Sequence, residues 1–149
     1  MGKQPTTSLN SLGYTIAYHG PEAEGATVYV YDLGKGAITD GPTGADVREA
    51  FDQATREVLA SEGQLDRAKV ELVDRYVTGS PTSGPQYLCA EFMIQLAAGS
   101  THRSYLYLTG VGSKFLKLRV TLPTTSPAVA TAREFADAME LVLWPSKFN

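Results

Sequence analysis

The chain has 149 residues, of which 43% are hydrophobic and 19% charged, and its net charge at pH 7 is −3. These values predict one globular domain that is large enough to bury a core. A nucleic-acid-binding protein usually needs a basic face, which the charge balance does not favour, and no apolar run approaches the ~20 residues of a membrane span. The single cysteine, Cys89, excludes an intrachain disulfide.

The N-terminal segment is polar and lacks the apolar stretch of a secretion signal. We expect residues 1–12 to be a disordered extension, native or added for expression, residues 13–145 to form a single α+β domain, and residues 146–149 to be a tail. The compartment stays open at this stage. The protein is periplasmic or secreted if a signal peptide has been removed from it, and cytoplasmic otherwise.

The first half of the chain predicts two strands and a helix. Residues 14–18 and 26–33 are rich in β-branched and aromatic side chains and flank a short Gly/Pro loop, which indicates an antiparallel hairpin. A helix follows, with Thr43 as its expected N-cap and Asp46 in the capping-box position, and it ends near Gly63. Its apolar stripe consists of Val47, Ala50, Phe51, Ala54 and Val58.

The second half predicts four strands and a second helix. The strands cover residues 70–77, 87–96, 103–109 and 115–122, and the glycine-containing segment 110–114 is expected to close a hairpin between the last two. A helix is expected from Ser126, a good cap followed by Pro127 at the first helical position, to Pro145.

Strict alternation in the last strand predicts one apolar face. Leu116, Leu118, Val120 and Leu122 point one way, whereas Lys117 and Arg119 point the other way. The element order ββ-α-ββββ-α predicts an α+β fold with a mainly antiparallel sheet. The simplest packing places both helices on a single face, built from these leucines and from the aliphatic residues of strands 87–96 and 103–109.

The predicted elements together resemble a known type of fold. The element order over about residues 12–145 resembles the PsbP-like fold, an α+β sandwich found in photosystem-associated and bacterial exported proteins. Residues 26–32, and residues 106–110 continuing through 115–123, also resemble an uncharacterised bacterial family of small exported proteins with that fold. The resemblance implies the fold, an extracytoplasmic location and a non-enzymatic role, and it brings no catalytic residues.

Motifs for catalysis, metals or cofactors are weak. The segment 110–114 lacks the spacing and the following helix of a phosphate-binding loop, so a hairpin turn is the preferred interpretation. Cys89 would need a neighbouring base to act as a nucleophile, and neither His19 nor His102 lies at a revealing spacing. Two isolated histidines do not indicate a metal site, and no cofactor is expected.

The eight tyrosines are the most informative residues. Alternation places Tyr87, Tyr105 and Tyr107 opposite the aliphatic face, and Tyr29 and Tyr31 join them if Val28 and Val30 face inward. The same face would receive Glu91, Lys117 and Arg119. Such a face suits a protein partner or a homodimer contact. The alternative is an ordinary solvent-exposed sheet face, on which Glu91 pairs with Lys117 or Arg119 across strands.

These patterns favour a non-catalytic binding or assembly module that uses the tyrosine-rich face, with Tyr87, Glu91, Tyr105, Tyr107, Lys117 and Arg119 as its contact residues, or the adjacent loops. The alternative is a small enzyme or ligand-binding domain. Its pocket would lie between the loops at residues 34–42 and 78–85 and would gather Asp32, Asp40 or His102.

Overall fold

The structure is a computed structural model, which describes residues 6–10, 13–19, 25–32, 38–64, 66–78 and 86–124, with side chains from residue 25 onward. The elements in this part of the chain are β1 (Thr6–Asn10), β2 (Gly13–His19), β3 (Gly25–Tyr31), α1 (Ala45–Ala60), β4 (Arg67–Thr78), β5 (Tyr87–Leu96), β6 (Thr101–Val111) and β7 (Lys114–Pro123). The helix expected between Ser126 and Pro145 and the tail at 146–149 lie outside the described residues.

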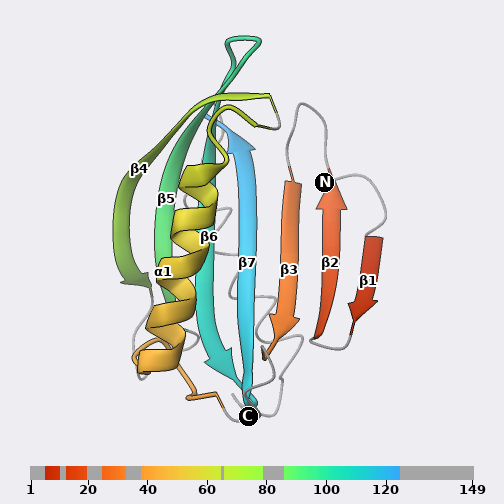
Figure 1. The fold of residues 1–149 in the computed structure, drawn as a ribbon, viewed down its shortest axis with the longest axis vertical. Coiled ribbons are helices and arrows are strands. Elements are labelled where there is room, and N and C mark those ends of the chain that lie inside the picture. The colour runs from red at the N-terminus through yellow and green to blue at the C-terminus, as the bar shows by residue number, and fades with distance from the viewer. Residues whose placement is uncertain are drawn as a thin grey trace.

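The strands form one seven-stranded sheet in the order β1-β2-β3-β7-β6-β5-β4 (Figure 1). Every neighbouring pair is antiparallel, so the mainly antiparallel α+β sheet is confirmed. The predicted β2–β3 and β6–β7 hairpins are both present. One strand was not expected: Thr6–Asn10, inside the segment predicted to be disordered, pairs with β2 as an edge strand.

The first predicted helix is confirmed as α1, but its N-cap is Gly44 and not Thr43. Asp46 in the first turn accepts hydrogen bonds from the backbone N–H of Thr39, at 2.9 Å, and of Val47, at 2.8 Å. These bonds, the one from Thr39 above all, hold the pKa of Asp46 below its usual value. Asp46 therefore ties the incoming segment to the start of the helix.

Helix α1 packs over one half of the sheet. Val47, Phe51, Ala54 and Val58 are buried against apolar residues of β4, β5 and β6. Arg75 of β4 adds an ion pair with Asp52 at 2.5 Å, and its guanidinium lies 4.9 Å from the centre of the Phe51 ring. In Figure 1 the helix crosses in front of β5 and β6 and leaves β7 and β3 beside it. The sheet is thus wider than the helix that covers it.

The turn between β6 and β7 sets which side chains share a face. Gly112 and Ser113 have φ values of +59° and +61°, as a two-residue type I′ turn requires, and Val111 pairs with Lys114. An even-numbered residue of β6 therefore lies opposite an odd-numbered residue of β7. Leu106 pairs with Arg119, and Tyr105 with Val120.

This register contradicts the single aliphatic face expected from the sequence. The helix face, which lies toward α1, carries Val70, Ala90, Phe92, Ile94, Leu106, Leu108 and Phe115, together with Tyr29, Tyr31, Lys117 and Arg119. The tyrosine face carries Ala26, Val28, Val30, Tyr76, Tyr87, Cys89, Glu91, Tyr105, Tyr107, Leu116, Leu118, Val120 and Leu122. Each face contains its own cluster of buried residues, so neither is simply a solvent-exposed sheet surface.

Strand β4 is an edge strand and is only partly covered. Leu72, Val73 and Val77 are 38%, 48% and 50% exposed. The pairing with β5 shifts between Leu72 and Asp74, which marks a β-bulge. The outer side of β4 pairs with no other described strand.

A close backbone approach at Gly110 generates the first prediction. Gly110 and Gly41 exchange two backbone hydrogen bonds of 2.8 and 3.1 Å, and a Cβ built at Gly110 would lie 1.9 Å from the carbonyl oxygen of Thr39. We expect Gly110→Ala to lower the free energy of unfolding by about 2–4 kcal/mol, measured by urea denaturation.

Gly99→Ala is the matched control. A Cβ at Gly99 meets nothing within 4 Å, although its φ of +101° makes alanine unfavourable. Its expected cost is about 1 kcal/mol. Equal losses in the two variants would contradict the close approach at Gly110.

Candidate functional site

The predicted contact patch is divided between the two faces of the sheet. Tyr105 and Tyr107 pair with Val120 and Leu118 and lie on the tyrosine face, together with Tyr87 and Glu91. Lys117 and Arg119 pair with Leu108 and Leu106 and lie on the helix face. The prediction of a single contact patch was therefore wrong. The two-residue turn places the odd-numbered residues of β6 and the odd-numbered residues of β7 on opposite faces of the sheet.

The tyrosine half of the patch is part of the core. Tyr87, Tyr105 and Tyr107 are each at most 1% exposed. The rings of Tyr105 and Tyr107 stack with centres 6.3 Å apart, and those of Tyr87 and Tyr107 meet edge to face at 5.6 Å. These side chains are not available as a docking surface in this structure. The expected protein partner or homodimer stays a prediction.

Glu91 does not pair with Lys117 or Arg119, which lie on the other face. Its carboxylate accepts a 2.6 Å hydrogen bond from the hydroxyl of Tyr76 on β4. Burial, followed by this hydrogen bond, raises the pKa of the Tyr76 phenol. Tyr76 and Glu91 therefore connect the edge strand to its neighbour on the tyrosine face.

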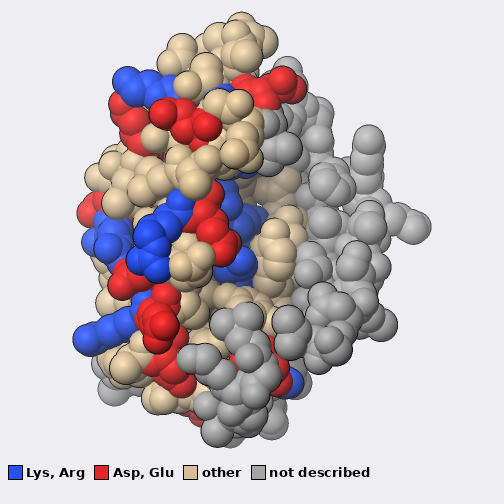
Figure 2. Space-filling view, viewed as in Figure 1, with Lys and Arg blue, Asp and Glu red and all other residues tan. Residues whose placement is uncertain are grey.

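The helix-face half of the patch lies in a groove between α1 and strands β7 and β3, which we call the α1–β7 groove. It consists of two cavities that share Ala54, Glu57 and Lys117 in their walls. The Tyr31 cavity has a volume of about 360 Å³ and is lined by Tyr31, Asp46, Glu49, Ala50, Gln53, Ala54, Arg56, Glu57, Phe115 and Lys117. The Arg119 cavity, of about 280 Å³, is lined by Tyr29, Ala54, Glu57, Val58, Ser61, Arg67, Leu106, Lys117 and Arg119. Figure 2 shows basic and acidic atoms side by side in a hollow on this side of the molecule.

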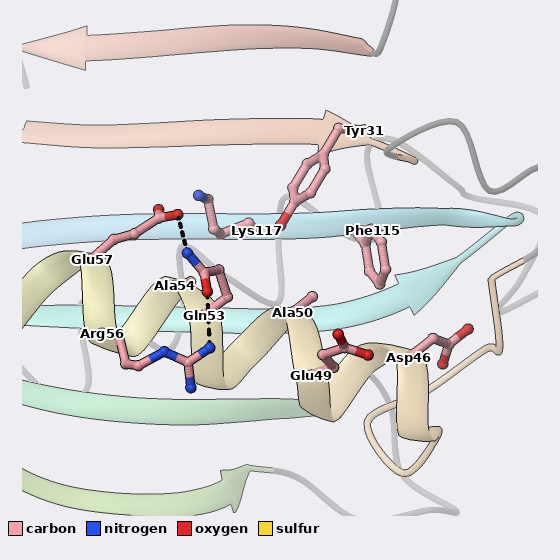
Figure 3. A pocket seen from close by; sticks show the side chains of 10 residues that line it. All are labelled: Tyr31, Asp46, Glu49, Ala50, Gln53, Ala54, Arg56, Glu57, Phe115 and Lys117. Carbon is pink, nitrogen blue, oxygen red and sulfur yellow. Dashed lines mark hydrogen bonds between the residues drawn. The ribbon is translucent and has the colours of Figure 1, made fainter.

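Lys117 projects from β7 into the Tyr31 cavity (Figure 3) and also lines the Arg119 cavity. Its ammonium nitrogen lies 4.3 Å from the ring centre of Tyr29 and 5.6 Å from that of Tyr31. Among the described residues it makes no ion pair. Burial lowers the pKa of Lys117, the charge of Glu57 opposes that effect, and the charge of Arg119 adds to it. The aromatic faces of the two tyrosines offset part of the cost of burying this cation.

Arg119 is the more deeply placed cation. Its Nη2 donates a 2.8 Å hydrogen bond to Ser104 Oγ, whereas its buried Nε has no hydrogen-bond partner in the described structure. Burial, with a smaller contribution from the charge of Arg67, lowers the pKa of Arg119 to about 10. Burial also lowers the pKa of Arg67, whose Nη1 donates to Ser61 Oγ at 2.8 Å.

The wall of the Tyr31 cavity that belongs to α1 is held by hydrogen bonds along the helix. Gln53 accepts from Arg56 at 2.8 Å and donates to Glu57 at 3.2 Å, as the dashed lines in Figure 3 show. Across the cavity, the rings of Tyr31 and Phe115 pack with centres 5.2 Å apart. Burial, followed by the charge of Glu57, raises the pKa of Tyr31 to about 12.

The other candidates from the sequence do not converge. Asp32 forms a 2.5 Å ion pair with Lys114, which lies beside the turn between β6 and β7. His102 is buried near the other end of β6. At about 3.3 Å per residue along β6, the two sites are roughly 30 Å apart. Cys89 is fully buried on the tyrosine face, whereas His102 lies on the helix face, so these two side chains cannot form a nucleophile–base pair.

The remaining candidates are only partly described. Asp40 is exposed, and most of the proposed loop pocket at residues 34–42 and 78–85 lies outside the described residues. Nowhere in the described segments do three or more His, Cys, Asp or Glu side chains gather as metal ligands would. The turn at 110–114 is a hairpin, as predicted.

Sequence reasoning placed Lys117, Arg119, Tyr29 and Tyr31 on one face, but it added Tyr87, Tyr105, Tyr107 and Glu91, which lie on the other face. It missed Arg67 and Glu57, which come from β4 and α1. The signal that could have separated Tyr105 and Tyr107 from Lys117 and Arg119 was the Gly112-Ser113 pair, because a two-residue turn fixes the register between β6 and β7. No sequence pattern indicated that Arg67 and Glu57 would lie near these residues, because their positions depend on how α1 packs across the sheet.

No protein-family model matches the chain, and no curated protein sequence does so. Its structure is similar to the solution structure of cyanobacterial PsbP (CyanoP) from Synechocystis sp. PCC 6803, with a TM-score of 0.53 over 91% of this chain and 90% of that chain. The chain has a PsbP-like fold. At 11% sequence identity the likeness concerns the fold alone.

This structural similarity does not test two of the predictions made from the sequence. Membership of the uncharacterised bacterial family and export from the cytoplasm therefore stay predictions. On the question of membranes, α1 is neither long enough nor apolar enough to cross one, and it is the helix that the described residues contain.

The hydrogen bond between Tyr76 and Glu91 yields a prediction of stability. We expect Tyr76→Phe to lower the free energy of unfolding by about 1–3 kcal/mol, because Glu91 loses the donor that compensates for its partial burial. Glu91→Gln, which keeps an acceptor for the hydroxyl, should cost less in the same urea denaturation. A neutral effect of Tyr76→Phe would show that the bond contributes nothing.

Tyr31 yields a prediction of pH dependence. Its pKa is raised from 10 to about 12 in the folded protein. It therefore contributes stability that is fully present below pH 10 and is lost as the pH rises toward 12. Between pH 9 and pH 11.5 the wild type should lose about 1–2 kcal/mol more unfolding free energy than Tyr31→Phe does. Identical losses, measured by urea denaturation at the two pH values, would contradict the buried state of this phenol.

Proposed function

We propose that this protein is a non-catalytic binding module that holds its ligand in the α1–β7 groove. The observation that carries the proposal is the pair of adjoining cavities, which have α1 on one side, β7 and β3 as their floor, and Lys117 at their junction. Ligand sites are typically concave and largely preformed, with apolar walls and a few polar groups that fix orientation. The Tyr31 cavity supplies apolar walls through Ala50, Ala54 and Phe115.

The rigidity of the groove supports this proposal. Its floor belongs to β7 and β3, which are inner strands paired on both sides within the sheet. Its opposite wall is a 16-residue helix that is anchored by the buried Phe51 and by the ion pair between Arg75 and Asp52. A site on such elements keeps its geometry better than a site on loops.

The position of the cations also supports a role in binding. Lys117 and Arg119 occupy the helix face in line with the buried Phe115, where an apolar residue would pack without a desolvation cost. Departures from the pattern that favours stability are typical of functional sites. The groove also holds Tyr29 and Tyr31, which place aromatic rings beside the cations.

A neutral aromatic probe tests whether the groove accepts a ligand. We expect indole, added to the full chain labelled with ¹⁵N, to shift the backbone amide signals of Tyr31, Phe115 and Lys117 in a saturable manner. Ala50→Trp should abolish these shifts, because Ala50 is half-buried and lines the Tyr31 cavity, so that the larger side chain fills it.

Ala60→Trp is the matched control, because Ala60 is an exposed alanine of the same helix and lines neither cavity. It should bind indole as the wild type does. The proposal is wrong if indole shifts amides elsewhere in the sheet, or if Ala50→Trp binds indole as well as Ala60→Trp does.

A further inference from the structure

We propose that the Arg119 cavity binds an oxoanion group, a carboxylate or a phosphate, at one end of a small ligand whose apolar body lies in the Tyr31 cavity. This inference rests on the proposed function, because it names the class of ligand for the same groove. It depends on the charges around the cavity, the unused hydrogen-bond donors and the continuity of the two cavities.

The charge balance of the Arg119 cavity is positive. Arg67, Lys117 and Arg119 line it, and among its described lining residues Glu57 is the one carboxylate. Lys117 and Arg119 are neighbours on one face of β7, and the fold brings Arg67 of β4 to them. In the Tyr31 cavity the balance is different, since Asp46, Glu49 and Glu57 accompany Arg56 and Lys117. An anionic group is therefore favoured in the Arg119 cavity and not in its neighbour.

Donors without a partner point to the same kind of ligand. Within the described structure the buried Nε of Arg119 has no hydrogen-bond partner, and a buried donor left without a hydrogen bond is costly. Arg and Lys are the side chains that proteins use most often to bind carboxylate and phosphate oxygens, and Arg does so in a bidentate manner. The ammonium of Lys117 lies over two aromatic rings and makes no ion pair within the described part of the chain, so its N–H donors are also available.

The guanidinium of Arg119 is already held in position. Ser104 Oγ accepts from its Nη2 at 2.8 Å and lies 3.0 Å from Thr121 Oγ1. This pair of hydroxyl groups uses one N–H of the guanidinium and restricts its rotation. A binding group that is fixed before the ligand arrives loses less conformational entropy on binding.

The two cavities together favour a ligand with two chemically different ends. Lys117, Ala54 and Glu57 belong to both walls, so a bound molecule can extend from one cavity into the other. Beyond Lys117 the walls include the packed rings of Tyr31 and Phe115. An aromatic or aliphatic body would cover these rings while its anionic end contacts Arg119.

The test uses three probes of similar size on the full chain at constant ionic strength: benzoate, phenyl phosphate and neutral benzyl alcohol. The readout is the side-chain Nε–H signal of Arg119, identified by its disappearance in Arg119→Lys. We expect a saturable shift with benzoate or phenyl phosphate, and the stronger of the two identifies the oxoanion. Benzyl alcohol should bind about tenfold more weakly and leave this signal in place.

Variants separate a specific site from general electrostatic attraction. Lys117→Gln and Arg119→Gln should each weaken binding of the preferred anion about tenfold. Arg48→Gln, which removes the same charge from an exposed position of α1 outside both cavities, should leave binding unchanged. Lys117→Gln keeps the test valid if Arg119→Gln does not fold.

Three results would overturn the inference: equal binding of benzyl alcohol and the anions, an equal loss in Arg48→Gln, or no shift of the Arg119 signal. If indole still occupies the groove in the wild type, any of these results rejects the oxoanion site and leaves the proposed function in place. If indole does not bind either, both proposals fail.

Discussion

The two-residue turn at Gly112 and Ser113 is the constraint on which the arrangement of both faces depends. Because side chains alternate along a strand, one residue more or fewer in this turn would exchange every inward and outward position of β7 relative to β6. With the turn as it is, Leu116, Leu118 and Val120 complete the cluster around the buried tyrosines. The positively charged residues between them are thereby directed toward α1.

The groove follows from the difference in width between one helix and a seven-stranded sheet. Helix α1 buries its apolar stripe against β4, β5 and β6, so the helix face over β7 and β3 needs another covering. Tyr29, Tyr31 and the alkyl chains of Lys117 and Arg119 supply part of it, because long cationic side chains cover apolar surface while their charged ends reach more polar surroundings. The floor of the groove is consequently amphipathic, with aromatic rings beside buried cations.

The sequence predicted the elements better than their relation to one another. Each strand expected within the described segments is present, and the N-cap of α1 lies one residue after the expected Thr43. The faces were wrong because leucine and tyrosine both suit a buried strand position, so alternation within one strand does not say which side meets which in the next. Only the register between strands decides that Tyr107 lies beside Leu118 and not beside Lys117. The groove could not be predicted from the sequence for a related reason, because Arg67 and Glu57 line it from elements that are distant from β7 in sequence.

The bulge in β4 has a consequence for the behaviour of the protein at high concentration. An uncovered edge strand with exposed valines is a template on which a second chain could add a strand. Here the bulge between Leu72 and Asp74 interrupts a regular ladder, and the ion pair between Lys69 and Glu71 would have to be desolvated by any strand that stacked alongside. Both features disfavour open-ended stacking of chains at this edge, where apolar side chains are exposed.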